Sequence, residues 1–379
     1  MIKKKWMGIV LGVLMVNSVK AQIGQLEWGQ PLLLPSIAKG KPHIGIAGPI
    51  AGVAAEYLLI GGGANFPDLA PWEGGAKRIQ KQIFVYKKEQ DKLVFVAQDD
   101  LDEGVAYGAS LHLPNGLLVI GGEDSKGRTV TCRLLNVETD SKKIIETPFP
   151  ELPVALSNMA AVRVEDRLFV AGGESKDGVS DLVLQLDLHD LAKGWVTVGH
   201  LPYAVSHSQL LADKDQVLYL VGGRKAHSDS PSALYNELWC STDLGISWPK
   251  KADIPFAAAA GTACILPDQG LWLLSADRGT TFHQVETLIF DAQKEPDPSK
   301  KQQLIATKNQ LQINHPGFGR EIWRYDLSSK HWEKAGELPM NAPVTTTAVL
   351  WDDMIILPSG EIRAGIRSPH ILVATFKEE

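Results

Sequence analysis

The stretch Leu168-Phe169-Val170-Ala171-Gly172-Gly173 decides the fold, because similar stretches recur along the chain. Each copy is a short apolar run closed by glycines, and the later copies follow one another roughly every 50 residues. The other three copies close at Gly61-Gly62-Gly63, Gly121-Gly122 and Gly222-Gly223. Apolar runs of this length that end in glycine favour buried strands over helices. The period is typical of solenoids, propellers and arrays.

Each of these runs is the second half of a predicted hairpin. Residues 159–162 lead through the turn residues 165–166 into the apolar run 167–170. A polar loop and two further strands follow, and the last strand carries a tryptophan or apolar residue, such as Trp195, before a Leu-Pro corner at 201–202. Four strands in a unit of about 50 residues make one propeller blade.

Two further hairpins lack the glycine pair. They join 262–265 to 271–274 and 346–350 to 354–357, which brings the expected number of blades to six. The last blade has residues 371–376 as its third strand and no fourth strand after it. We expect residues 25–28 to supply that outer strand, since closing the ring with both termini removes an exposed sheet edge. The fold class is therefore all-β, a six-bladed β-propeller.

Composition limits the other choices. The net charge of −6, with no basic cluster beyond the N-terminus, argues against a nucleic-acid surface. Residues 1–21 show the basic, apolar and small-residue regions of a signal peptide, which predicts a periplasmic or secreted protein whose single domain covers 22–379. The apolar segment is too short to span a membrane. The three cysteines show neither disulfide nor metal spacing, so we expect buried thiols and no metal site.

Propeller geometry predicts where polar side chains meet. The end of the second strand and the start of the first strand of each blade emerge on one face near the axis. Residues expected in this funnel are Asn65, Tyr107, Glu123, Ser157, Asn158, Glu174, His207, Arg224, Thr262, Asp277 and Glu361, with Arg363 and Arg367 from the last loop. Such a funnel indicates a site for a small polar ligand. The alternative for Glu123 and Glu174 is that they cap nearby backbone N–H groups.

Two connections are much longer than the rest. Residues 64–82 in the first blade and 278–320 in the fifth both leave from the end of a second strand. The fifth-blade connection includes the polar segment 294–310. Long loops on a regular scaffold are usually lids, binding loops or disordered tails.

The glycine-pair blades are identified as kelch repeats, and other motifs resemble one family more specifically. Asn65-Phe66-Pro67, Glu73-Gly74-Gly75-Ala76-Lys77, Ala106-Tyr107-Gly108 and the segment from Gly360 to Arg367 are similar to the bacterial N-acetylneuraminate epimerases. The resemblance extends over nearly all of the chain after the signal peptide, with the blades in cyclically permuted order. A closed ring tolerates permutation, because neighbouring blades stay the same.

The resemblance implies interconversion of the α and β anomers of free N-acetylneuraminate, a small sugar acid, without a cofactor. It implies that Glu361 is the acid/base residue and that Arg367 holds the substrate carboxylate. A loop cap for Glu361 and a surface ion pair for Arg367 are the structural alternatives. The funnel adds as substrate-binding candidates Arg363, Asn65, Tyr107, Arg224, His207 and Asn158.

Two departures from the family pattern concern the substrate more than the reaction. Val105 stands where the enterobacterial proteins have an arginine, so one basic group is lost. The fifth blade has Ala276-Asp277 in place of its glycine pair.

Other functions remain open. A noncatalytic carbohydrate- or protein-binding propeller is the main alternative. Residues 241–248 match the Asp-box of sialidase propellers, in which Asp243 binds local N–H groups and Trp248 packs between sheets. A sialidase is the weaker alternative, since the sequence has one box and no recognisable arginine triad.

Overall fold

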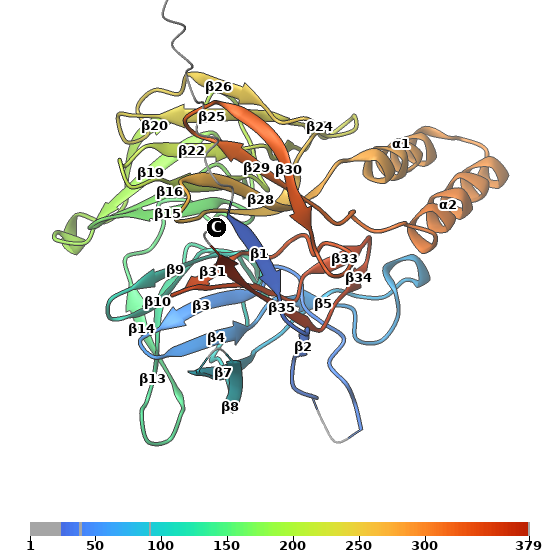
Figure 1. Cartoon of the computed structure of the whole chain (residues 1–379). Coiled ribbons are helices and arrows are strands. Elements are labelled where there is room, and N and C mark those ends of the chain that lie inside the picture. Colours follow the sequence, from blue (N-terminus) through green and yellow to red (C-terminus); the bar gives the residue numbers. More distant parts are fainter. Residues whose placement is uncertain (1–23, 38–39, 91, 378–379) are drawn as a thin grey trace, which may run out of the picture.

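The computed structural model describes residues 24–37, 40–90 and 92–377, and it is a β-propeller with one helical insertion (Figure 1). Six antiparallel sheets form the blades, which confirms the predicted fold class. The first strands of neighbouring blades contact one another around the axis. The expected signal peptide, 1–21, lies outside the described residues. No helix in the described ranges is long and apolar enough to cross a membrane.

The strands follow the predicted hairpins closely. The first blade contains β3 (Ile50–Ala54), β4 (Tyr57–Gly61), β7 (Gln82–Glu89) and β8 (Lys92–Asp100). The second contains β9 (Ala109–Leu113), β10 (Gly116–Ile120), β13 (Cys132–Val137) and β14 (Ile144–Phe149). The third contains β15 (Ala160–Val164), β16 (Arg167–Ala171), β19 (Leu182–Asp187) and β20 (Val196–His200). The next two are β21 (Gln209–Ala212), β22 (Leu218–Val221), β25 (Glu237–Ser241) and β26 (Lys250–Asp253); and β27 (Ala259–Ile265), β28 (Gly270–Asp277), β29 (Glu321–Asp326) and β30 (His331–Glu337). The second strands β4, β10 and β22 are buried along their whole length.

The two ends of the chain close the ring, as predicted. The last blade contains β31 (Val349–Trp351), β32 (Met354–Pro358) and β35 (His370–Lys377). β1 (Gln25–Trp28) pairs antiparallel with β35 as the outer strand, and β2 (Leu32–Leu33) continues along the same edge. The edge of β35 is therefore covered by the chain itself.

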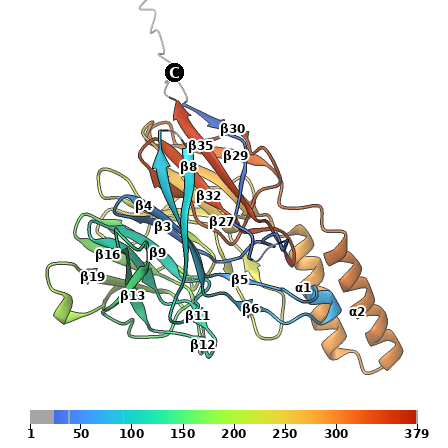
Figure 2. The same cartoon turned by 90° about the horizontal axis from the view of Figure 1, so that it is seen from below.

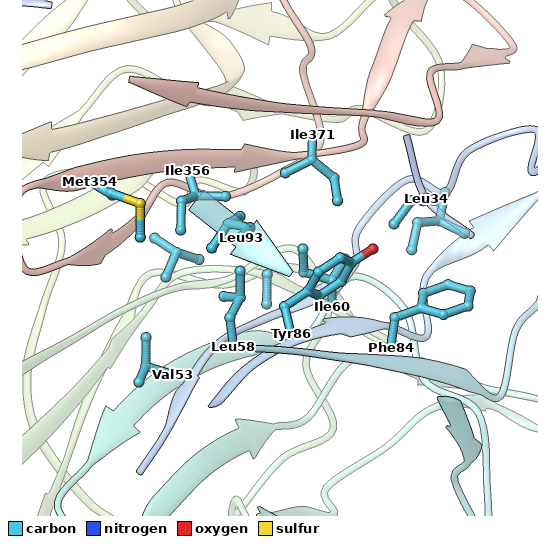
Figure 3. Packing of buried hydrophobic residues seen from close by; sticks show 13 residues of the cluster. Leu34, Val53, Leu58, Ile60, Phe84, Tyr86, Leu93, Met354, Ile356 and Ile371 are labelled. Carbon is cyan, nitrogen blue, oxygen red and sulfur yellow. The ribbon is translucent and has the colours of Figure 1, made fainter. Parts of the chain in front are cut away.

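Apolar side chains fill the space between blades. Figure 3 shows one such cluster, in which Leu58 and Ile60 of β4 face Ile356 of β32 and Ile371 of β35. This cluster joins the first and last blades, so the ring is closed by packing as well as by strand pairing. Burial of each such side chain contributes about 1.5–3 kcal/mol relative to exposure.

The glycine pairs turn the chain sharply at the end of each second strand. Gly172 and Gly173 have φ of 65° and 98°, and a Cβ on Gly172 would lie 2.2 Å from the carbonyl oxygen of Val205 in the next blade. In the last blade Ser359 and Gly360 adopt the same conformation, with φ of 57° and 103°. The turn is thus preserved where the glycine pair is lost.

After these turns the chain forms small two-stranded hairpins that the sequence did not predict. They are β5 (Ala64–Asn65) with β6 (Arg78–Ile79), β11 (Glu123–Asp124) with β12 (Gly127–Arg128), β17 (Glu174–Ser175) with β18 (Gly178–Val179), β23 (Arg224–Lys225) with β24 (Ala233–Leu234), and β33 (Glu361–Arg363) with β34 (Ile366–Arg367). The chain passes from one blade to the next through short connections, such as those between β14 and β15 and between β20 and β21.

The two long connections are ordered. The first carries the short helix η1 (Pro71–Glu73), and another short helix, η2 (Leu191–Lys193), lies in the third blade. The segment 278–320 forms α1 (Thr280–Lys294) and α2 (Pro298–Ile313), which pack against each other. Helix α2 contacts η1 in the connection between β5 and β6 (Figure 2), and Nδ2 of Asn309 donates to the carbonyl of Trp72 in η1. The sequence pattern indicates a long loop for this segment and does not predict its two helices.

Candidate active site

A closed ring of backbone hydrogen bonds surrounds the propeller axis. Six residues, one just before the first strand of each blade or at its start, donate N–H groups to the carbonyl of the preceding member at 2.7–2.9 Å. In ring order they are Gly48, Tyr107, Asn158, His207, Ala260 and Thr345. All six have φ between 52° and 60°, a left-handed conformation that costs energy for any residue except glycine. The same six residues line a central cavity of about 120 Å³.

The small hairpins place their first residue beside this ring. Isolated bridges join Ala47 to Ala64, Ala106 to Glu123, Ser157 to Glu174, Ser206 to Arg224 and Val344 to Glu361. Glu123, Glu174, Arg224 and Glu361 therefore occupy equivalent positions, as the sequence predicted. In the first blade the equivalent residue is Ala64.

The prediction for Asn65 needs correction, because it lies one position beyond Ala64. Asn65 is buried, its Nδ2 donates to the carbonyl of Gly45 at 3.0 Å, and its Oδ1 accepts from Gln80 at 2.9 Å. The amide is thus used inside the protein. Thr262 is likewise fully buried, and Ala260 takes the ring position expected for it.

Glu361 and Arg367 face each other across the β33–β34 hairpin. Nη2 of Arg367 lies 3.5 Å from Oε2 of Glu361, while Oε1 accepts from the N–H of Gly365 at 2.7 Å. Burial raises the pKa of Glu361, although the charge of Arg367 and the N–H of Gly365 act in the opposite direction. Nε and Nη1 of Arg367 are buried and have no partner among the described residues. Unpaired buried donors are costly, so this guanidinium has donors that an anionic group could satisfy.

Aromatic rings hold Arg367 in place. Its guanidinium carbon lies 4.6 Å from the ring centre of Phe66, and its charge acts on the hydroxyl of Tyr107. Nζ of Lys77 lies 4.8 Å from the ring centre of Tyr107 and donates to Oε2 of Glu123 at 2.7 Å. Lys77 thus supplies a positive charge close to this side of the site. The sequence placed Lys77 in a motif but assigned it no role.

A second polar cluster joins residues of the second, third and fourth blades. The carboxylate of Glu174 accepts from Nη2 of Arg128 at 3.0 Å and from Nη2 of Arg224 at 3.2 Å. Nε of Arg224 donates to Nδ1 of His207 at 3.3 Å. Burial, with the charge of Arg224, lowers the pKa of His207 to about 3, so the ring is neutral at physiological pH with its hydrogen on Nε2. No sequence feature pointed to Arg128.

The fifth blade contributes a carboxylate. Asp277 ends β28, and its Oδ1 accepts from the N–H of Gly279 at 2.8 Å. Burial raises the pKa of Asp277, and its charge acts on both Arg224 and Glu361. The guanidinium of Arg224 in turn lies 5.1 Å from the ring centre of Phe282 in α1. The helical insertion therefore borders the site.

The remaining candidates differ in position. Asn158 lines the central cavity, and its Nδ2 donates to Oγ of Ser157 at 3.4 Å. Arg363 is exposed at the end of β33 and faces away from the pair formed by Glu361 and Arg367 in the hairpin register. Substrate contacts by Arg363, Asn158, Tyr107, His207 and Arg224 stay predictions.

Known proteins give an independent comparison. A family model for N-acetylneuraminate epimerase matches residues 11–145 and 149–379. The chain belongs to the N-acetylneuraminate epimerase family. A relative of that name from Brucella suis is 34% identical over 115 residues, which cover 29% of this chain and 30% of the relative. Another from Salmonella typhimurium is 22% identical over 235 residues, covering 62% of this chain and 60% of the relative.

The fold has a match among solved structures. The structure of YjhT superposes with a TM-score of 0.60 at 15% identity, covering 91% of this chain and 99% of that chain. At this identity the likeness supports the propeller fold. The matches to the two curated relatives span about a third and three fifths of their lengths. The cyclic permutation of the blades stays a prediction.

The lone Asp-box is a structural turn on the outer rim, between β25 and β26. Oδ1 of Asp243 accepts from Oγ of Ser241 at 2.7 Å and from the N–H of Ser247 at 2.9 Å. Trp248 is buried and donates to the carbonyl of Gly245 at 3.1 Å. These contacts account for the motif without a catalytic role.

Proposed function

We propose that this protein interconverts the α and β anomers of free N-acetylneuraminate by opening and closing the sugar ring. The observation that carries the proposal is the pair of unpartnered N–H groups on the buried side chain of Arg367, next to the partly buried carboxyl of Glu361. A guanidinium with free donors suits the carboxylate of a sugar acid, and family membership supports the same substrate class.

Glu361 provides the proton transfers in this proposal. Its carboxylate takes the proton of the anomeric hydroxyl as the anomeric carbonyl forms and the bond from that carbon to the ring oxygen breaks. Glu361 then returns the proton to the ring oxygen, which gives the open-chain keto acid. Rotation about the adjacent bond and the reverse steps close the ring on the other face. No electrons are exchanged with another molecule, so the proposal includes no cofactor.

Arg367 orients the substrate while the ring opens. Its free donors Nε and Nη1 lie on different edges of the guanidinium, and each can hold a carboxylate oxygen together with Nη2, which fixes the neighbouring anomeric carbon near Glu361. Phe66 limits the rotation of the guanidinium by stacking against it. Positioning of this kind lowers the entropic part of the barrier.

The decisive experiment follows the α-anomer of N-acetylneuraminate by NMR immediately after a sialidase releases it. We expect the wild-type protein to speed its conversion to the β-anomer above the spontaneous rate. The Glu361→Gln and Arg367→Ala variants should slow this conversion. Spontaneous rates with saturating wild-type protein would sink the enzymatic proposal.

The same measurement distinguishes the enzyme from a noncatalytic propeller, because a binding propeller would bind the sugar without changing the anomerisation rate.

A sialidase is less well supported by the geometry. Tyr107 lies near Glu361 and Arg367, but Arg128 and Arg224 both pair with Glu174 and do not join Arg367 in a triad.

We also propose export to the periplasm or the medium, on the basis of residues 1–21. Cell fractionation of the full chain checks it, with the protein expected outside the cytoplasm and about 21 residues shorter by mass spectrometry.

A further inference from the structure

The backbone ring forms the floor of the site, and the side chains that it carries differ in size from blade to blade. The ring residues of the second, third and fourth blades are Tyr107, Asn158 and His207, whereas the fifth and sixth blades have Ala260 and Thr345. Gly48 of the first blade is covered, because a Cβ there would lie 2.4 Å from Cδ1 of Tyr107. The open part of the floor therefore lies at the fifth and sixth blades, beside Glu361.

Asp277 borders this open part. Strand pairing places Asp277 opposite Ala259, directly before Ala260 of the ring. One carboxylate oxygen accepts from the N–H of Gly279 at 2.8 Å, and the other accepts from none of the described residues. The Asp277 charge acts on both Glu361 and Arg224. A free acceptor at the start of the fifth-blade insertion is thus coupled to both polar clusters of the site.

Resting on the proposed function, we propose that Asp277 is a specificity-determining residue for the sugar acid. Its free carboxylate oxygen accepts a hydrogen bond from a donor on the part of the substrate remote from the carboxylate. That donor is a hydroxyl of the polyol chain or the N–H of the acetamido group, both of which suit an acceptor-only carboxylate.

The charge of Asp277 also sets the direction in which the substrate binds. Two of the arginines at the site, Arg367 and Arg224, could each hold the carboxylate of an anionic sugar. Arg224 is already paired with Glu174, and a substrate carboxylate placed there would meet the negative charges of Glu174 and Asp277. Repulsion between like charges is strong in a partly buried site, so it favours binding of the substrate carboxylate at Arg367 over binding at Arg224.

The test compares Asp277→Asn with the wild type on three substrates: N-acetylneuraminate, its analogue with a hydroxyl in place of the acetamido group, and its analogue with a shortened polyol chain. Asparagine keeps an oxygen for the N–H of Gly279 and removes the charge. On N-acetylneuraminate we expect KM to rise about tenfold or more and kcat to change less than about threefold, as for loss of a charged hydrogen bond in binding. The analogue that lacks the donor bound by Asp277 should lose this difference between the two proteins.

The matched control is Asp177→Asn, an exposed aspartate at the tip of the β17–β18 hairpin on the same face, which should leave KM unchanged. Thermal unfolding checks that Asp277→Asn is folded. An unchanged KM for Asp277→Asn, or an equal rise on all three sugars, overturns the inference.

Calorimetric titration of the same proteins separates this inference from the proposed function. If the wild type binds the sugars without speeding anomerisation, and Asp277→Asn weakens binding in the same pattern, the proposed enzymatic function fails and the specificity role stands. If the wild type binds none of the three sugars, both are overturned.

Discussion

Arg367 and Glu361 are directly opposed in the β33–β34 hairpin, with Nη2 of the arginine 3.5 Å from Oε2 of the glutamate. The contact is longer than a normal charged hydrogen bond. It leaves the guanidinium donors Nε and Nη1 free and the carboxyl close by, so one short hairpin carries both the group that we propose binds the anion and the group that we propose transfers the proton.

We expect replacement of Arg367 to weaken substrate binding. In Arg367→Lys the charge is kept and the two-pronged fork is lost, so KM should rise by roughly tenfold or more, and Arg367→Ala should be worse. Steady-state anomerisation rates measure both. Arg78→Lys, an exposed arginine paired with Asp68, is the control. Equal KM for Arg367→Lys and wild type would contradict bidentate binding.

We expect Glu361→Gln to act mainly on kcat. Glutamine keeps an oxygen for the N–H of Gly365 but transfers no proton, so kcat should fall roughly 10²–10⁴-fold with little change in KM. The control is Glu56→Gln at an exposed turn. A variant with near-normal kcat shows that another group transfers the proton.

The pH profile should report the buried carboxyl. Because burial raises the pKa of Glu361 above the usual 4.5, the catalysed rate should increase with pH through a midpoint above that value, as the base form accumulates. Arg367→Ala should move this midpoint further up, since removal of a positive charge favours the protonated acid. Rates must be corrected for spontaneous anomerisation. A midpoint at or below 4.5 would falsify the assignment of Glu361 as the base.

Ring closure should be needed for stability. A chain that begins at residue 30 lacks β1 and leaves residues 374–377 of β35 unpaired on that edge, while β2 still pairs with residues 370–371. We expect this chain to melt at a lower temperature than a chain that begins at residue 24. We also expect it to scatter more light as its concentration rises, because the exposed strand edge can pair with another copy. Identical melting curves would mean that the pairing of β1 with β35 contributes little.

The stability lost when a turn glycine is replaced by alanine should depend on the space around the added Cβ. Gly178→Ala has open space around the added Cβ, so it carries only the conformational cost of the positive φ of 117°, about 1–3 kcal/mol. Gly172→Ala adds a clash with the carbonyl of Val205 and should be destabilised further. Denaturant unfolding compares the two, and equal losses would contradict the steric explanation.

Much of the fold could be read from local patterns. The hairpins before Gly172-Gly173 and its relatives, and the strand at Gln25–Trp28, depend on alternation and turn residues that act over a few positions. The helical insertion was missed because α2 is polar on all sides and shows no apolar periodicity. Its N-cap was nevertheless visible, since Asp297 precedes Pro298 and accepts from the N–H of Ser299.

The site was predicted only in part. The roles of Glu361 and Arg367 came from the resemblance, and the equivalence of Glu361 to Glu174 and Arg224 came from the repeat. Asn65 was misplaced by one residue, because three consecutive glycines hide which two form the turn; the φ angles assign it to Gly62 and Gly63. A shift of one residue in a strand moves a side chain to the other face.

The sequence by itself determined the repeat, the number of blades and the closure of the ring, because these follow from short-range patterns of apolar, glycine and turn residues. Only the tertiary structure decided how the blades meet at the axis. Three features join residues from different blades. They are the backbone ring through Tyr107 and His207, the pairing of Arg128 with Glu174, and the action of the Asp277 charge on Glu361. No local pattern encodes such contacts, since each depends on the angle and distance between separate sheets.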